Sequence, residues 1–426
     1  MSNRPYKIKI KTFIYFVIIY NMIIPFFINN LGFPSVLMYA ADLINIILCI
    51  YSLGKFGNLF NKIGFGLVLV SIVLYTVSLL IGIILNAVSP FLVLWAIRNT
   101  FRFFVFFIAC VCFLHKEDIN KIFNLFYKLQ ILNVLLSTYQ HFYLGLRQDT
   151  LGGIFGTEVG SNAYTNIFFC IILTHSVVTY LQKKGTFKRM AFVVLSTILV
   201  GVYAELKFYF IEMAIIIILS LLICKPNKKT ITVIIVSFIT VFIGLNILEK
   251  FDPLTYQTIT NYVDLMSYAD MSGIGGYNIS RMSAFEQINE MFFKDNILLN
   301  LFGYGFGNAE MSSVSSFLIS DFYKNYGYLN YRWFSNAMKF LETGYLGIGF
   351  FIFFFISILI CSFKLRKKMS ADKEYILFIE VFVPIVIINI WYNNAISIDI
   401  AYITFFALSV VAVIYKNQLK QSMTIK

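Results

Sequence analysis

Two arginines that stand four residues apart inside an apolar run are the first residues in this chain that could do chemistry. Arg98 and Arg102 follow Pro90, and a spacing of four places both side chains on one face of a helix. At ~1.5 Å per residue they lie about 12 Å and about 18 Å along that helix. An arginine so deep in a bilayer costs at least ~2.5 kcal/mol unless it faces a cavity or a partner. The pair therefore favours an outward-open, water-filled pocket that binds an anion, whereas the plainer alternative is an internal ion pair with Asp42.

A second charged pair lies in a connection that is too short to form a free loop. Glu205 and Lys207 belong to the segment 203–208 between two apolar runs, so both side chains must lie at the outer mouth of the protein. Lys207 suits an anion site, and it could equally extend its ammonium group toward lipid headgroups.

Four more charged residues flank the apolar runs on the same side. Arg147 begins one outer loop, Arg281 begins a helix in the longest loop, and Arg332 lies just before the tenth apolar run. An exposed loop arginine is usually only solvated, so spacing alone gives these three no specific role. Glu342 lies near the start of the tenth run and is a candidate base or orienting group.

The composition requires a membrane around these residues. The 426 residues are 59% hydrophobic and 13% charged, and the mean hydropathy is +0.79. Apolar runs of about 17–25 residues recur along the chain, each long enough to cross the hydrocarbon layer. Such runs form helices, because backbone groups in lipid must bond within their own segment. We predict an all-α polytopic membrane bundle of about twelve transmembrane helices, which start near Thr12, Phe33, Gly64, Pro90, Ile122, Ala163, Met190, Phe208, Thr230, Phe340, Tyr375 and Ile396.

The formal net charge of +13 follows the predicted topology. Every second connection is basic, as the positive-inside rule predicts for cytoplasmic loops, so both termini are expected in the cytoplasm and no nucleic-acid partner is implied. The basic segments are Arg4 to Lys11, Lys55 to Lys62, Lys116 to Lys121, Lys183 to Arg189, Lys225 to Lys229, Lys364 to Lys373 and Lys416 to Lys426.

The long outer loop is expected to form a cap on a single domain. Residues 1–426 are predicted to be one integral membrane domain, with an extracytoplasmic cap loop at 249–339 between the ninth and tenth spans. Within the cap, apolar residues at 282, 285, 288, 291 and 292 have the spacing of an amphipathic helix. All six cysteines fall within or at the ends of apolar runs without metal-ligand spacing, so no disulfide framework, metal or other cofactor is expected.

Three segments together resemble the O-antigen and capsular polysaccharide polymerases of the Wzy type, in the O-antigen ligase and polymerase superfamily. The resemblance covers about half of the chain, and it departs from the ligases at Trp333, where they usually have a histidine. The segments are Arg147 with Gly152–Gly156 and Ser161-Asn162, then Glu205-Leu206-Lys207, and last Arg281 with Leu301–Gly307 and Glu342-x-Gly344-x-x-Gly347.

The resemblance implies an enzyme of the bacterial cytoplasmic (inner) membrane, which is a metal-independent glycosyltransferase. It would polymerise oligosaccharide repeat units linked to undecaprenyl pyrophosphate on the outer face of that membrane. The catalytic residues would be Arg281 with Glu342 or Glu205 as the base. The pyrophosphate-binding residues would be Arg98, Arg102, Lys207, Arg147 and Arg332.

Other functions fit the same features. The alternatives are an O-antigen ligase, a flippase or transporter for lipid-linked oligosaccharide, and a non-enzymatic scaffold, for which paired intramembrane arginines have no evident use. A transporter is disfavoured by the absence of a repeat between the two halves of the chain. The expected partners are undecaprenyl-pyrophosphate-linked glycans and the lipid bilayer, and the resemblance also admits a chain-length regulator protein.

Overall fold

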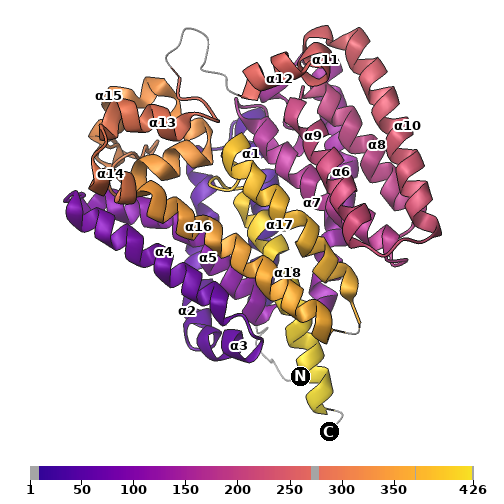
Figure 1. Cartoon of the computed structure of the whole chain (residues 1–426), viewed down its shortest axis with the longest axis horizontal. Helices are drawn as coiled ribbons and strands as arrows, with labels where there is room; N and C mark the ends of the chain where they lie inside the picture. Colours follow the sequence, from indigo (N-terminus) through magenta and orange to yellow (C-terminus); the bar gives the residue numbers. More distant parts are fainter. Residues whose placement is uncertain (1–8, 270–277, 370, 425–426) are drawn as a thin grey trace, which may run out of the picture.

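The computed structural model describes residues 9–269, 278–369 and 371–424, and these residues form helices and no strand (Figure 1). Nine helical segments among them are long and apolar enough to cross a membrane. The chain is therefore an all-α, multi-pass membrane protein. The nine are α1 (Ile10–Leu31), η1 with α2 (Ser35–Tyr39 and Ala40–Leu53), α4 (Gly66–Leu85), α5 (Pro90–Phe113), α7 (Ser161–Leu181), α10 (Lys228–Phe251), α16 (Ser335–Lys368), α17 (Lys373–Tyr392) and α18 (Ala401–Thr424).

Three further long helices coincide with the other predicted spans. These are α6 (Lys116–Phe142), α8 (Phe187–Tyr203) and α9 (Lys207–Ile223). α8 and α9 have only 17 residues each, and α6 is much less apolar than its neighbours, so none of them is among the nine. The predicted start of each span nevertheless lies within a few residues of the beginning of a helix.

The outer surface of the bundle is apolar, as a bilayer requires. α7 is the central helix, buried along nearly its whole length by contacts with α8, α9 and α17. By contrast, α2, α4 and α10 carry large apolar side chains that are more than half exposed, which only lipid can cover at this density. They include Leu43, Ile46, Ile50, Val73, Leu80, Ile84, Ile231, Phe238 and Phe242.

One end of the bundle gathers the basic connections. Each of the seven basic segments recognised in the sequence takes part there in a contact with another segment or with a residue that shortly precedes one. The contacts are Lys11 with Asp118, Lys116 with Asp372, Lys229 with the Gly185 carbonyl, Arg366 with the Ile223 carbonyl, Lys416 with the Leu114 carbonyl, and Lys55 over the Phe113 ring. The positive charge therefore collects at one end because of how the helices pack.

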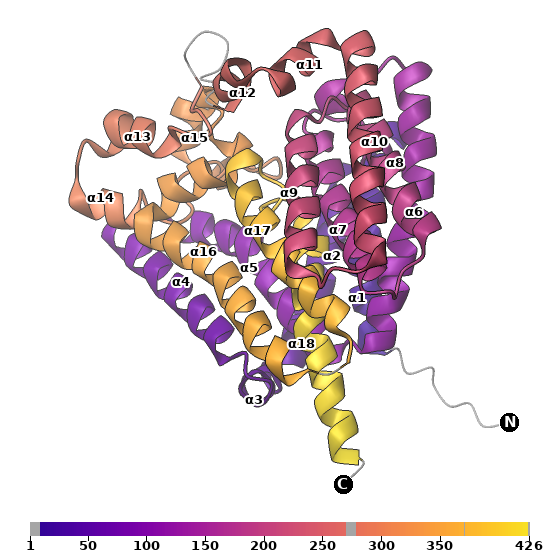
Figure 2. The ribbon, with the colours of Figure 1, turned by 45° about the vertical axis from the view of Figure 1, so that its right-hand side comes forward.

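The segment between α10 and α16 folds over the opposite end of the bundle (Figure 2). Residues 270–277 of the predicted cap lie outside the described residues. The rest forms short elements: α11 (Pro253–Thr260), α12 (Tyr262–Ala269), α13 (Ala284–Ile288), η4 (Asn289–Phe293), α14 (Ile297–Phe302), η5 (Ser316–Leu318), α15 (Asp321–Tyr326), η6 (Gly327–Leu329) and η7 (Tyr331–Trp333).

The amphipathic helix expected at 280–292 is shorter than predicted, and its apolar face is only partly right. α13 and η4 cover this segment, and Ile288 is fully buried while Phe285 stacks on Phe340 at 4.3 Å between ring centroids. Met282 and Met291 were expected on the same face, yet they are 64% and 46% exposed. The π-helical turn of η4 rotates the later residues away from the α-helical register.

A glycine bend divides α16 into a short leg and a long leg. Gly344 has φ +60° and ψ −165°, a conformation essentially limited to glycine, and an added Cβ would lie 2.5 Å from the Asn300 carbonyl oxygen. Gly303 fits against the bend from the cap, where its own added Cβ would lie 2.4 Å from the Glu342 carbonyl carbon. The Tyr304 amide donates to the Leu341 carbonyl at 2.8 Å. The bend and the cap therefore pack against each other through backbone atoms.

Replacing Gly344 by alanine should destabilise the fold, and replacing Gly349 in the same helix should not. The Gly344→Ala change imposes backbone strain on the order of 1–3 kcal/mol together with the clash. Gly349 is exposed, helical and free of neighbours within 4 Å, so Gly349→Ala is tolerated. Thermal unfolding of the purified protein can be followed with a thiol-reactive dye, because Cys110, Cys170 and Cys361 are buried until the chain unfolds. Equal melting temperatures for the two variants would contradict the role of the bend.

Candidate functional site

A pocket of about 500 Å³ lies at the capped end of the bundle. It is formed by α5, the short leg of α16, the loop before α18 and the cap. Its size suits a small ligand or part of a larger one, and its wall combines aromatic rings with charged groups. The charged residues that line it are Arg98, Arg102, Arg332, Lys339, Glu310, Glu342 and Asp399, and the aromatic ones include Tyr39, Trp95, Tyr164, Tyr323, Trp333 and Phe351.

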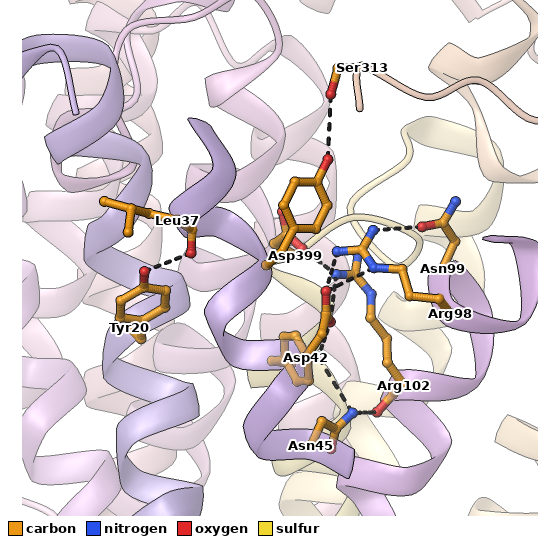
Figure 3. Close-up of polar contacts among 11 residues, drawn as sticks. Tyr20, Leu37, Asp42, Asn45, Arg98, Asn99, Arg102, Ser313 and Asp399 are labelled. Atoms are coloured by element: carbon orange, nitrogen blue, oxygen red, sulfur yellow. Dashed lines mark hydrogen bonds and ion pairs between the residues drawn. The ribbon is translucent and has the colours of Figure 1, made fainter. Parts of the chain in front are cut away.

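One wall of the pocket is an ion network around Asp42 (Figure 3). Arg98 binds Asp42 through two nitrogens, with Nε 2.8 Å from Oδ2. Arg102 Nη1 lies 2.6 Å from Asp399 Oδ1 and 3.4 Å from Asp42 Oδ1. The side chain of Asn45 completes the wall by donating to the Arg102 carbonyl at 2.6 Å. The alternative considered from sequence, an ion pair with Asp42, is therefore present, and Asp399 from the α18 loop joins it.

Aromatic rings hold both guanidinium groups in place. Arg98 Cζ lies 4.6 Å from the centroid of Tyr39 and 5.0 Å from that of Trp95, and Arg102 Cζ lies 4.6 Å from that of Phe103. Planar cations stack favourably on such faces. Among the described residues, Nη2 of Arg102 has no acceptor. This nitrogen is a donor left over after the ion pairs are made.

A second ion pair lies within the cap, and Asn99 of α5 links it to the bundle. Arg332 Nη1 lies 3.0 Å from Glu310 Oε2, and Asn99 Nδ2 donates to the same oxygen at 3.1 Å. Arg98 in turn donates to Asn99 Oδ1 at 2.7 Å, so the two ion pairs form one chain of contacts. Burial acts to lower the pKa of Arg332, but the Glu310 charge and hydrogen bond outweigh it and raise that pKa. Arg332 is therefore a permanent cation at the rim.

Glu342 projects from the short leg of α16 into the pocket and is 3% exposed. Its Oε1 accepts hydrogen bonds from the Gly307 amide at 3.1 Å and the Ala309 amide at 3.0 Å. Its Oε2 has no donor among the described residues. One oxygen thus fixes the carboxylate against the cap turn, and the other is available to a ligand in the pocket.

Lys339 lies one helical turn before Glu342 and was not among the residues singled out from the sequence. It is only 9% exposed, lines the pocket, and places Nζ 4.0 Å from the centroid of Phe351. Its position three residues before a candidate base, on one helix face, is the signal that could have identified it. Asp399 and Glu310 were missed as well, although Asp399 is a carboxylate within a predicted apolar run.

Arg281 and Lys207 meet beside the pocket and do not line it. Both lie over the ring of Tyr268, with Arg281 Cζ at 4.7 Å and Lys207 Nζ at 5.3 Å from its centroid. Arg281 also lies 4.8 Å from the centroid of Phe334, a ring that lines the pocket. These two cations, far apart in sequence, therefore contact the same ring beside the pocket.

Glu205 and Arg147 lie outside both groups. Glu205 is half-buried in the turn between α8 and α9, and Arg147 is exposed before η2. Partial burial raises the pKa of the Glu205 carboxyl, although a hydrogen bond with Gln148 acts in the opposite direction. Neither residue lines the pocket.

Removing Asp42 should cost far more stability than removing an exposed carboxylate. Asp42→Ala leaves two buried or half-buried guanidinium groups with fewer partners, and breaking such a pair typically costs about 3–5 kcal/mol. Asp321→Ala in the cap removes the carboxylate that pairs with Lys324. The Asp321 side chain is 89% exposed, so the loss of stability should be less than about 1 kcal/mol. The comparison is of melting temperatures in one detergent. A loss for Asp42→Ala no larger than for Asp321→Ala would show that the network adds no stability.

The structure thus places four of the eight sequence-selected residues, Arg98, Arg102, Arg332 and Glu342, around one pocket. Two more, Arg281 and Lys207, share a ring beside it. In the comparisons with known proteins, no protein-family model matches this chain and no curated protein matches it.

Proposed function

We propose that this protein is a membrane glycosyltransferase that polymerises lipid-linked oligosaccharide repeat units, similar to the polymerases of the Wzy type. The observation that carries the proposal is the pocket at the capped end, where a buried carboxylate, several fixed cations and aromatic rings converge. A lipid-linked sugar keeps its tail in the bilayer, so its reacting carbon stays near the end of the helices. Aromatic rings offer flat apolar faces for sugar rings, and the few polar groups orient them.

The proposed reaction has two coupled parts. The glycosidic bond from the donor sugar to undecaprenyl diphosphate breaks, and its electron pair goes to the departing diphosphate oxygen. A hydroxyl of the acceptor sugar forms the new bond to the anomeric carbon and gives its proton to Oε2 of Glu342. General base catalysis of this kind contributes typically about 10²–10⁴-fold.

The developing charge on the diphosphate needs fixed donors in a site that excludes most water. Arg102 and Arg332 supply guanidinium nitrogens at the pocket wall, and Arg281 with Lys207 supplies charge from behind Phe334. The proposal gives no catalytic role to Glu205 and no diphosphate contact to Arg147, because both lie away from the pocket. No metal ion takes part in this scheme.

The proposal includes twelve crossings, with α6, α8 and α9 added to the nine. An odd number of crossings would put the beginning of α1 and the end of α18 on opposite sides of the membrane. Lys11 in α1 binds Asp118, and Lys416 in α18 binds the carbonyl of Leu114, which precedes Asp118 by four residues. Both ends of the chain thus contact one short segment, which supports an even number of crossings. The basic end is then cytoplasmic by the positive-inside rule, with both termini there and the cap at 249–339 outside.

Cysteine labelling tests the crossing of α6. Leu144→Cys, just after α6, should react with a membrane-impermeant maleimide in intact cells, and Lys184→Cys, after α7, should react only after the membrane is opened. Both positions are exposed in the structure. Each change is made in a variant whose six native cysteines are replaced by alanine or serine. Labelling of Lys184→Cys but not Leu144→Cys in intact cells would overturn the proposed topology.

Chain growth in liposomes tests the activity itself. Purified protein and labelled undecaprenyl-diphosphate repeat units should yield a ladder of longer glycans. Glu342→Gln keeps an oxygen for the Gly307 and Ala309 amides but removes the base, so elongation should fall at least about 100-fold. Arg281→Ala should leave cells with single repeat units only, whereas Lys324→Ala on the exposed cap should behave as the unmodified protein.

Three outcomes would contradict the polymerase. Movement of the labelled lipid across the bilayer without lengthening indicates a transporter. Transfer of the glycan to a lipid A core acceptor, in place of a second repeat unit, indicates a ligase. Normal long chains in both Glu342→Gln and Arg281→Ala would remove the proposed site.

A further inference from the structure

The arginines that line the pocket are already paired with carboxylates. Arg98 binds Asp42, Arg102 binds Asp42 and Asp399, and Arg332 binds Glu310, all within 4.0 Å. An anion that approached any of them would have to compete with a fixed negative charge. Each arginine therefore offers an incoming anion only the nitrogens that its carboxylate leaves over, and an unpaired cation would strengthen the binding of an anion in this pocket.

Lys339 is that cation. Its ammonium group lies within 4.0 Å of no carboxylate among the described residues, where it contacts the ring of Phe351. The side chain is 91% covered and still lines the pocket. A lysine ammonium has three N–H donors, and none of the three has an acceptor in the described part of the chain.

The direction of the side chain is also unusual for a lysine near a helix end. Lys339 lies four residues after the beginning of α16, where a lysine would ordinarily extend toward the membrane surface. Instead it reaches the ring of Phe351, which belongs to the long leg of α16 beyond the bend at Gly344. The bend brings the two legs close enough for this contact. Lys339 thus points inward, into the pocket.

The acidic groups near Lys339 form no ion pair with its ammonium group among the described residues. Glu342 gives Oε1 to two backbone amides, and Glu310 accepts from Arg332 and Asn99. The ring that the ammonium group contacts is that of Phe351, and the ring of Tyr75, which also lines the pocket, lies 5.6 Å from it between centroids. An incoming anion would meet the ammonium group without displacing an existing ion pair.

We propose that Lys339 binds the anionic group of the ligand directly, and that this group is a diphosphate. The anion-binding role rests on the pocket alone, and the identity of the anion as a lipid-linked diphosphate rests on the function proposed above. A lysine ammonium is a compact charge that binds phosphate oxygens without a fixed planar geometry. It can therefore follow the diphosphate as the glycosidic bond lengthens.

Binding of undecaprenyl diphosphate to the purified full chain tests this role. Trp95 and Trp333 line the pocket, so tryptophan fluorescence reports occupancy. Lys339→Met keeps the length of the side chain and removes the charge, and it should raise the Kd about 10- to 100-fold, the loss of one charged hydrogen bond. Lys339→Arg should retain most of the affinity. Lys364→Met, an exposed lysine later in α16, is the matched control and should not change the Kd.

Two further probes identify the anion. Undecaprenol lacks the diphosphate and should bind equally weakly to the unmodified protein and to Lys339→Met. Inorganic pyrophosphate that competes with the lipid supports recognition of the diphosphate itself, and absence of competition supports recognition of the lipid-linked form. Lys339→Gln provides a second neutral variant if Lys339→Met is recovered unfolded.

The outcomes separate this inference from the proposed function. An unchanged Kd in both neutral variants, or no binding of undecaprenyl diphosphate by the unmodified protein, overturns the inference and leaves Lys339 as a packing partner of Phe351. Lys339-dependent binding without any glycan lengthening overturns the polymerase but supports the anion site. Lengthening by Lys339→Met with unchanged KM for the lipid-linked donor overturns the anion site and leaves the polymerase standing.

Discussion

The site depends on how charge is kept inside a bundle of apolar helices. A guanidinium group in such surroundings is stable only with carboxylates or rings around it. Asp42 on α2 serves two arginines of α5, and Asp399 before α18 serves one of them. Asn99 then carries the network to Glu310 in the cap. One set of polar contacts therefore ties three helical segments and the cap into a single wall, and the pocket lies beside it.

Much of the fold could be predicted because the membrane imposes a simple length rule. Each expected span begins near a helix, and the basic connections meet at one end. Two arginines on one helix face at depth demand polar surroundings, and the structure pairs Arg98 and Arg102 with Asp42 and lines the pocket with both. Glu342 was selected as a candidate from its place at the beginning of a span, and its side chain lines the same pocket.

The remaining residues escaped prediction for physical reasons. One partner of Arg102 comes from the far end of the chain: Asp399 is close to it only because α18 packs against α5. Lys339 resembles an ordinary interfacial lysine until the bend at Gly344 is known. Glu205 and Arg147 had the right charges on the right side, but the turn after α8 and the loop before α7 hold them apart from the pocket. The spacing of residues along the sequence predicts how deep a side chain lies and on which face of its helix. It does not predict which helices become neighbours.

The two backbone amides that hold Glu342 have a mechanical consequence. They belong to the turn at 303–309, which lines the pocket with Phe306 and orients its carboxylate with the Gly307 and Ala309 amides. An outward movement of this turn would break both hydrogen bonds and release the carboxylate. A ligand that enters the pocket while both hydrogen bonds persist must therefore pass at the rim or from the lipid side, by a path that leaves this turn in place.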